Sequence, residues 1–154
     1  NQIQDDAGGQ FRRMIRLLKR FARSRGKKWN MPNGLKLTML AAECFERSHE
    51  RDDKAFYFLL DNLNRRLAKT RVVYNLAQST SPQDTLTKTE EDANMVELHQ
   101  RVYEALTKLS VTWTSQCDQR STREAWDWVF QTNGFFQDFD LRVANQSSPP
   151  IPRR

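Results

Sequence analysis

Apolar residues recur at steps of three and four along most of the chain, a pattern typical of amphipathic helices rather than strands. The first such stretch begins at Phe11 and should end near Gly26. Its apolar positions are Phe11, Met14, Ile15, Leu18, Phe21 and Ala22. Because successive helical residues are turned by about 100°, four basic residues fall in a narrow arc on the opposite side: Arg12, Arg16, Lys19 and Arg23. The pattern therefore predicts a helix with an apolar back and a cationic front.

Two more helices are expected in the first half of the chain. A loop over residues 26–33 leads into an apolar helix from Leu35 to about Arg47. Asp52 and Asp53 suit the first turn of the next helix, since carboxylates there face the positive end of the helix dipole. That helix should run to about Thr70.

In the second half of the chain, the residue pattern predicts a loop and two helices. Periodicity fades over residues 71–88, where Ser, Thr, Pro and Asp accumulate, so we expect a long loop there. Thr87 and Glu90 have the spacing of a capping box, and apolar residues then step along a long helix as far as Trp113. Ser121 and Glu124 repeat this signal before a short helix whose aromatic residues we expect in the core: Trp126, Trp128 and Phe130, followed by Phe135 and Phe136.

The fold class predicted by these patterns is all-α, a bundle of about five helices in one domain over residues 11–136. Residues 1–10 are expected to be a flexible lead-in or a connection to a preceding part of a longer chain, and residues 137–154, rich in Asn, Ser, Pro and Arg, a tail. No apolar run reaches the ~20 residues that cross a bilayer, which argues against a membrane protein. Cys44 and Cys117 form neither a disulfide framework nor a zinc motif, so we expect a cytoplasmic setting.

The excess positive charge of the chain is concentrated in the predicted first helix and the residues that follow it. Of the 25 Lys and Arg residues, nine lie between Phe11 and Lys28 without an acid among them, and the other 16 are outnumbered by the 19 Asp and Glu residues. A localised anionic partner would explain this concentration. The alternatives are a polyphosphate, a nucleic-acid backbone, an acidic protein surface, or a basic face that is merely solvated.

Candidate catalytic residues are few. Asp138 and Asp140 form a D-x-D pair, the spacing that holds magnesium when it lies on a strand, but here it follows a helix and suits a polar surface segment. His49 and His99 have no Ser, Cys or acidic partner at a recognisable spacing. We therefore assign no catalytic residue and no metal ligand to this chain.

Two groups of motifs resemble a known family. Residues 15–21 (IRLLKRF) followed by residues 32–38 (PNGLKLT) look like the start of the helical lobe in 2′-5′-oligoadenylate synthetases and cGAS/DncV-like nucleotidyltransferases. Residues 124–130 (EAWDWVF) followed by residues 134–136 (GFF) are similar to the closing helix of the bacterial members. The order and spacing of these motifs carry the resemblance across most of residues 11–136.

This resemblance implies roles for particular residues. Lys19 matches a lysine that contacts the donor triphosphate, and Asn33 stands where the family often has a serine that touches the same phosphates. Arg16 and Arg12 lie on the same helix face and join them as candidate donor-binding residues. Gly34 stands where some members carry an aromatic residue that stacks on the donor base.

The complete enzyme implied by the resemblance makes cyclic oligonucleotide messengers from nucleoside triphosphates such as ATP and GTP, with Mg²⁺, during bacterial defence against phage. Its catalytic carboxylates belong to an amino-terminal lobe, which would be this chain's partner, so the chain alone should be inactive. The rival prediction is a small module that uses the basic helix of residues 12–28 to bind nucleic acid or an acidic protein.

Overall fold

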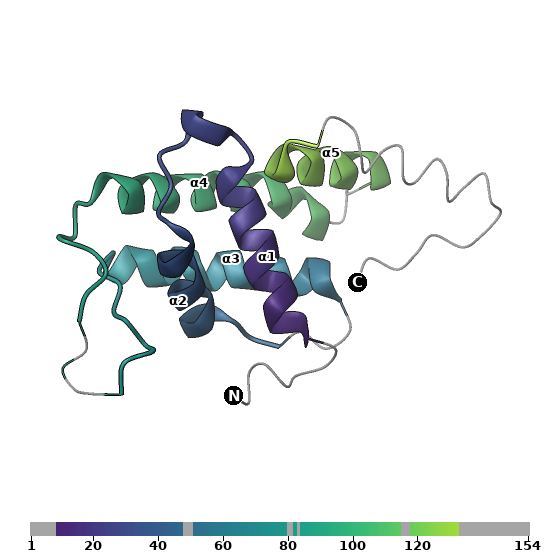
Figure 1. Ribbon diagram of the computed structural model, residues 1–154. Helices are drawn as coiled ribbons and strands as arrows, with labels where there is room; N and C mark the ends of the chain where they lie inside the picture. The colour runs from purple at the N-terminus through teal and green to yellow at the C-terminus, as the bar shows by residue number, and fades with distance from the viewer. Residues whose placement is uncertain (1–8, 48–50, 80–81, 83, 115–117, 133–154) are drawn as a thin grey trace.

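Five α-helices make up the described part of the chain, which a computed structural model defines over residues 9–47, 51–79, 82, 84–114 and 118–132 (Figure 1). In chain order they are α1 (Gln10–Arg23), α2 (Gly34–Cys44), α3 (Asp52–Lys69), α4 (Ala93–Leu109) and α5 (Gln119–Phe130). Short 3-10 helices, η2 (Gly26–Lys28) and η3 (Ser110–Trp113), follow α1 and α4. The described residues form no strand. The prediction of an all-α bundle of about five helices is confirmed.

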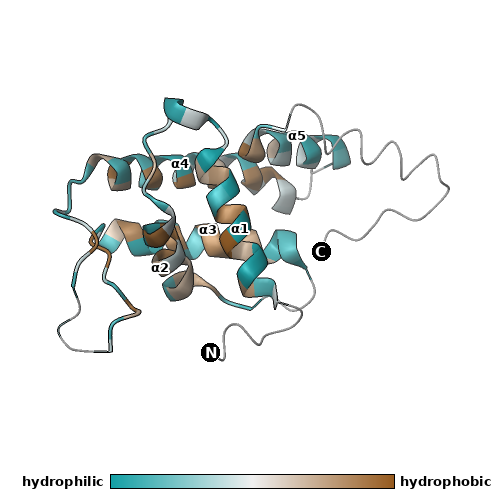
Figure 2. Cartoon of the chain, viewed as in Figure 1, coloured by the Kyte–Doolittle hydropathy of each residue, from teal (hydrophilic) through white to brown (hydrophobic). Residues whose placement is uncertain are grey.

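The bundle is built around α3, which packs against α1, α2 and α4, while α5 closes one end against α4 and α1. Figure 1 shows α1 crossing in front of α3, and Figure 2 shows apolar and polar bands alternating along the helices. The apolar stripe predicted for α1 is buried apart from Ile15, which is half-buried, and Met14, Leu18 and Phe21 are fully inaccessible to solvent. Each such side chain contributes about 1.5–3 kcal/mol through the hydrophobic effect. The burial of one stripe leaves the basic side of α1 facing outward.

Aromatic rings fix α5 onto this core. Phe130 lies with its ring centroid 5.5 Å from that of Phe56, and Trp126 stacks on Phe130 at 6.0 Å. The expected core role of Trp126 and Phe130 is confirmed, since they are only 8% and 7% exposed. Trp128 is half-buried, and Phe135 and Phe136 lie outside the described residues.

Arg25 joins the end of α1 to the end of α5. Its guanidinium lies between two indole rings, 4.3 Å from the centroid of Trp29 and 4.6 Å from that of Trp128. It donates hydrogen bonds to the backbone carbonyls of Trp128 and Val129, the latter at 2.9 Å. Burial, together with the charge of Arg101, lowers the pKa of Arg25. Both carbonyls belong to the last turn of α5, so the side chain acts as a cap for that helix.

The capping box predicted for α4 is wrong. The helix begins after Asp92, whose carboxylate accepts hydrogen bonds from the backbone of Lys88 and Thr89. Thr87 is buried and accepts a hydrogen bond from the backbone N–H of Val73. Glu90 accepts hydrogen bonds from the Thr70 hydroxyl and from the Arg71 backbone N–H, the latter at 2.7 Å. The side chains of Thr87 and Glu90 are thus hydrogen-bonded to residues distant in the sequence and do not cap α4.

Other helix boundaries also differ from the expectation: α1 ends at Arg23 rather than near Gly26, and α4 ends at Leu109, with the 3-10 helix η3 continuing to Trp113. The N-cap of α5 is Asp118, which accepts a 2.7 Å hydrogen bond from the Ser121 backbone N–H, so the capping role expected for Ser121 is wrong. Helix α2 ends at Cys44 rather than near Arg47. Its backbone becomes extended at Phe45, whose ring packs 5.3 Å from that of Phe11.

A long loop connects α3 to α4, as expected. Its two arms pair through backbone hydrogen bonds from Asn75 N–H to the Asp84 carbonyl at 2.8 Å and from Leu86 N–H to the Val73 carbonyl at 2.7 Å. Glu90 ties the loop's end to its beginning through the contacts with Thr70 and Arg71. The loop is therefore closed at its base by both backbone and side-chain bonds.

Within the described ranges, none of the helices combines the length and the apolar character that crossing a bilayer requires. Residues 137–154, the tail expected from the sequence, lie outside the described part of the chain, as do most residues of the expected lead-in. Gln10 belongs to α1 and is fully buried, so the folded unit begins slightly earlier than residue 11.

Candidate functional site

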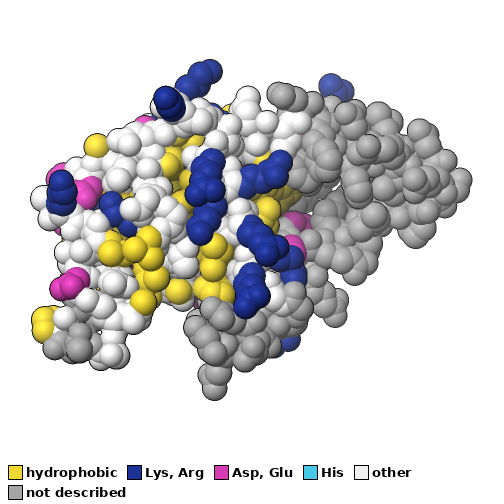
Figure 3. Space-filling model, in the orientation of Figure 1, with side chains coloured by type: hydrophobic (Ala, Val, Ile, Leu, Met, Phe, Trp, Pro, Cys, Tyr) yellow, Lys and Arg dark blue, Asp and Glu magenta, His cyan; other side chains and the backbone are white. Residues whose placement is uncertain are grey.

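A row of positively charged side chains covers the outward face of α1 and continues onto η2. Figure 3 shows Lys and Arg side chains gathered over this part of the molecule. Its members, here called the basic row, are Arg12, Arg16, Lys19, Arg20, Arg23, Lys27 and Lys28. Lys19 is half-buried and the other six are exposed. The row exists because the helix buries its apolar stripe and turns the opposite side to solvent.

Among the described residues, no carboxylate pairs with the basic row. None of its seven members forms an ion pair with a described residue. Arginines elsewhere in the described chain do pair with carboxylates, and these are Arg13, Arg51, Arg65, Arg66, Arg71, Arg101 and Arg120. Like charges three or four residues apart on a helix repel one another. An anion lying against the row would relieve that repulsion.

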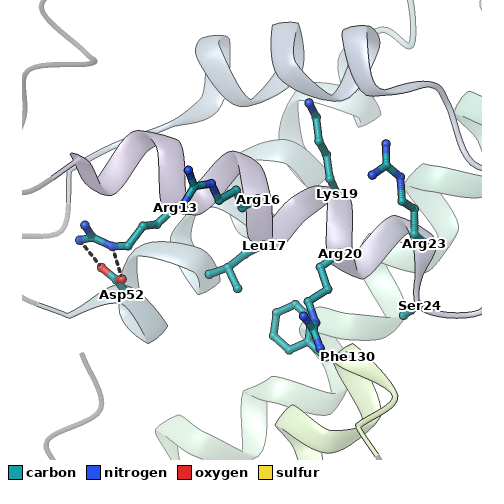
Figure 4. A pocket seen from close by; sticks show the side chains of 9 residues that line it. All are labelled: Arg13, Arg16, Leu17, Lys19, Arg20, Arg23, Ser24, Asp52 and Phe130. Atoms are coloured by element: carbon teal, nitrogen blue, oxygen red, sulfur yellow. Dashed lines mark hydrogen bonds and ion pairs between the residues drawn. The ribbon is translucent and has the colours of Figure 1, made fainter.

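An open groove of about 720 Å³ runs along α1 (Figure 4). It is called here the α1 groove, and its lining residues are Arg13, Arg16, Leu17, Lys19, Arg20, Arg23, Ser24, Asp52 and Phe130. Asp52 comes from the first turn of α3 and Phe130 from the last turn of α5, so three helices form its walls. Most of the charged side chains in the groove are cations.

The amino-terminal end of α2 adds to the positive potential beside the groove. A β-carbon built on Gly34 would lie 3.5 Å from the Lys19 Nζ and 3.7 Å from an Arg23 guanidinium nitrogen, so both cations rest against the first turn of α2. Asn33 caps this helix and accepts a 3.0 Å hydrogen bond from the Lys36 backbone N–H. Because the start of a helix carries partial positive charge, helix and side chains favour the same kind of ligand.

The structure brings together some of the residues predicted for the site. Lys19 and Arg16 both line the α1 groove. Arg12 lies on the same face but does not line the groove. Asn33 is exposed and does not line it either, and the oxygen of its side-chain amide is used in the cap of α2. Asn33 is nevertheless adjacent to Gly34, against which Lys19 rests.

Sequence reasoning missed other residues of the groove. Arg20 belongs to the basic stretch and could have been found by extending the helical arc by one residue. Leu17, Ser24, Asp52 and Phe130 gave no signal of this role. Asp52 and Phe130 come from distant elements, and no local pattern reports that they meet α1.

Asp52 is the acidic residue among those that line the groove, and its carboxylate is already hydrogen-bonded to other side chains. Its carboxylate accepts hydrogen bonds from Arg13 at 2.6 Å and 3.0 Å and from Gln10 at 3.2 Å. Burial opposes the charged form, but these hydrogen bonds and the charge of Arg13 prevail and lower the pKa of Asp52. The pair neutralises one end of the groove and leaves the other end cationic.

The described residues hold no group of three or more His, Cys, Asp and Glu side chains that could bind a metal ion. Asp138, Asp140 and His49 lie outside the described part of the chain. His99 is half-buried on α4, and burial together with the charge of Arg71 lowers its pKa. Burial, and next to it the charge of Glu43, raises the pKa of the Cys44 thiol to about 12.

Comparisons of the chain with protein families, curated proteins and solved structures give no significant match. The groove and the motifs of residues 15–38 and 124–136 are therefore the features that bear on the function of this chain.

Proposed function

We propose that the chain is the helical lobe of a bacterial anti-phage nucleotidyltransferase that makes cyclic oligonucleotides, and that it binds the donor triphosphate. The observation that carries this proposal is the convergence of Lys19 and Arg23 on the first turn of α2, where neither forms an ion pair with a described residue. The motifs that resemble the family favour a nucleotide, rather than another polyanion, as the bound ligand. Lys19, Arg16 and Arg23 come from one rigid helix, which fixes their spacing.

The chemistry of the side chains suits phosphates. The ammonium of Lys19 is a compact charge that can follow phosphate oxygens, while the planar guanidinium groups of Arg16 and Arg23 can each bind two oxygens at once. Charge on the phosphates grows during phosphoryl transfer, so such contacts also favour the transition state. Asn33 directly precedes Gly34, against which Lys19 rests, and it caps α2 through its amide oxygen, so the donor part of the amide is its NH₂ group.

The described residues do not provide a magnesium site. Asp52, the carboxylate of the α1 groove, is held by Arg13 and Gln10, and no acidic cluster stands beside it. The metal-binding carboxylates are therefore assigned to the amino-terminal lobe, together with the chemical step. On this proposal the helical lobe contributes binding and orientation of the triphosphate.

Calorimetric titration of the chain with inorganic triphosphate and with ATP tests the binding role. Lys19→Gln should weaken binding of both by about 1.5–3 kcal/mol, the usual worth of a hydrogen bond to a charged group. Arg47→Gln is the matched control, because Arg47 is exposed, lies outside the groove and makes no ion pair with a described residue. Equal affinities of wild type and Lys19→Gln for both ligands would refute the assignment. In the enzyme assembled with its amino-terminal lobe, the same substitution should lower the yield of cyclic product.

Nucleic-acid binding is the second candidate, and the length of the basic row favours it. The row follows the whole of α1 and continues to Lys27 and Lys28, beyond the reach of one triphosphate. The 14 residues of α1 alone span about 21 Å at 1.5 Å per residue. A duplex bound in this way should show a log–log salt slope of about −0.9 for each phosphate engaged. Absence of duplex binding at low salt removes this candidate.

A further inference from the structure

The side of the α1 groove that faces α5 has an apolar floor. Figure 4 shows Leu17 and Arg20 extending toward Phe130, whereas Lys19 and Arg23 extend the other way, toward α2. Leu17 and Phe130 both line the groove, and Leu17 is half-buried. The floor is therefore distinct from the corner at Gly34 to which the triphosphate is assigned.

Two cations, Arg16 and Arg20, line the groove beside this floor. Arg16 and Arg20 are exposed and form no ion pair with a described residue. Arg13, at the far end, is held by Asp52 through bonds of 2.6 Å and 3.0 Å. An anionic group is thus attracted to Arg16 and Arg20 rather than to the end neutralised by the Arg13–Asp52 pair, which sets the direction of a bound ligand.

The floor is preformed. The ring of Phe130 is held against Phe56 and lies parallel to Trp126 within 9°. Arg25 fixes the backbone of the same turn through the carbonyl of Val129. A ligand placed on such a wall loses little affinity to reordering of the protein.

We infer that Arg16, Leu17, Arg20 and Phe130 form a binding site for a small amphiphilic anion, a planar aromatic group joined to a phosphate or carboxylate. The aromatic part lies on Leu17 and against the small accessible part of Phe130, which is 7% exposed, and the anionic part pairs with the two guanidinium groups. The groove volume of about 720 Å³ suits a small organic molecule, since such sites commonly measure about 300–1,000 Å³. Leu17, Arg20 and Phe130 lie on the other side of α1 from Lys19 and Gly34, whereas Arg16 is shared with the proposed triphosphate site, so Arg20 and Leu17 are the residues that distinguish this site from that one.

Calorimetric titration of the whole chain at low salt with 1-naphthyl phosphate, 1-naphthoate, inorganic phosphate and 1-naphthol tests this site. The two aromatic anions should bind at least about tenfold more tightly than inorganic phosphate or 1-naphthol, because only they engage both the floor and the cations. Equal affinity for 1-naphthyl phosphate and inorganic phosphate would show that the groove offers charge alone, and would overturn the inference.

Paired variants separate this site from the triphosphate site. Arg20→Gln should weaken binding of 1-naphthyl phosphate about tenfold and leave inorganic triphosphate unaffected, while Lys19→Gln should do the reverse. Leu17→Asn tests the floor and should weaken the aromatic anions while leaving inorganic phosphate unaffected. Arg47→Gln serves as control, and circular dichroism verifies the fold of each variant. Unchanged binding of 1-naphthyl phosphate to Arg20→Gln would contradict the inference, whereas unchanged triphosphate binding to Lys19→Gln would contradict the proposed function alone.

Discussion

Lys19 rests on the first turn of α2, where the space beside residue 34 accommodates a β-carbon but is otherwise filled by the Lys19 and Arg23 side chains. A β-carbon at this position would meet the Lys19 Cε at 3.4 Å, which is an ordinary contact distance. Any further atoms would occupy the space that the Lys19 and Arg23 side chains now fill. Residue 34 therefore controls where these two cations lie.

Substitutions at residue 34 test this control. Gly34→Val should displace the Lys19 ammonium and weaken binding of inorganic triphosphate by about 1 kcal/mol or more, since the charge-assisted contact depends on position. Gly34→Ala is the matched control and should bind as wild type does. Calorimetric titration measures both, and an equal loss in the two variants would contradict the steric explanation.

The Arg13–Asp52 pair predicts a pH dependence of stability. The pKa of Asp52 is lowered in the folded protein, so its stabilisation is complete above the unfolded carboxyl value of about 3.9 and is lost as the pH falls through the lowered folded value. Asp52→Asn should reduce the free energy of unfolding at pH 7 by about 1 kcal/mol, a modest figure because Arg13 is partly exposed to screening solvent.

The difference in unfolding free energy between wild type and Asp52→Asn should shrink as the pH falls below about 4. Urea unfolding at a series of pH values gives this difference. Asp61→Asn is the control, because Asp61 pairs with the exposed Arg65 on the same helix and such pairs contribute only about 0.3–0.5 kcal/mol. A difference for Asp52→Asn that stays constant down to pH 2 would refute the linkage.

At the scale of elements, hydrophobic periodicity predicted the existence and order of the helices correctly. The burial of Phe56, Leu63 and Leu67 on α3 follows directly from their three- and four-residue spacing. Helix starts were harder to predict, because a capping motif records only local spacing. Thr87 and Glu90 have the right separation, but Val73 and Arg71 use their side chains instead. The competing partners are 14 and 19 residues away in the chain, where no short motif could reveal them.

The bond between Thr87 and Val73 is a test of how the loop is held. Thr87→Val keeps the shape of the side chain but leaves the Val73 N–H buried without its acceptor, which should cost about 1–2 kcal/mol of unfolding free energy. The urea midpoint should fall while the slope of the transition stays the same. Thr85→Val is the control, because the Thr85 side chain is exposed. Equal midpoints for Thr87→Val and wild type would show that this bond does not stabilise the loop.

The residues of the α1 groove were only partly predictable, because some of them meet only through contacts between distant parts of the chain. The cationic arc of α1 follows from helical geometry, and Arg16 and Lys19 were found in this way. The groove also needs Asp52 and Phe130, which reach α1 only through tertiary packing. The sequence therefore predicted the charge of the site and one of its walls.

At the scale of the whole molecule, the core shields the thiol of Cys44. Burial raises its pKa to about 12, so the reactive thiolate is scarce at pH 8. In a Cys117→Ser background, where Cys44 is the remaining thiol, the folded protein should react with Ellman's reagent at least about a thousandfold more slowly than the urea-unfolded chain. The labelling rate then reports opening of the bundle. Rapid labelling of the native protein would contradict the buried position of Cys44.

The closed base of the loop between α3 and α4 has a practical consequence. Glu90 joins Thr70 and Arg71 on one side to the start of α4 on the other, and the arms are already paired at Asn75 and Asp84. The ends of the loop are therefore fixed to each other, and lengthening a loop whose ends are fixed costs little entropy. A reporter such as a small fluorescent domain, inserted between Ser79 and Asp84, would leave both the bundle and the basic face of α1 intact.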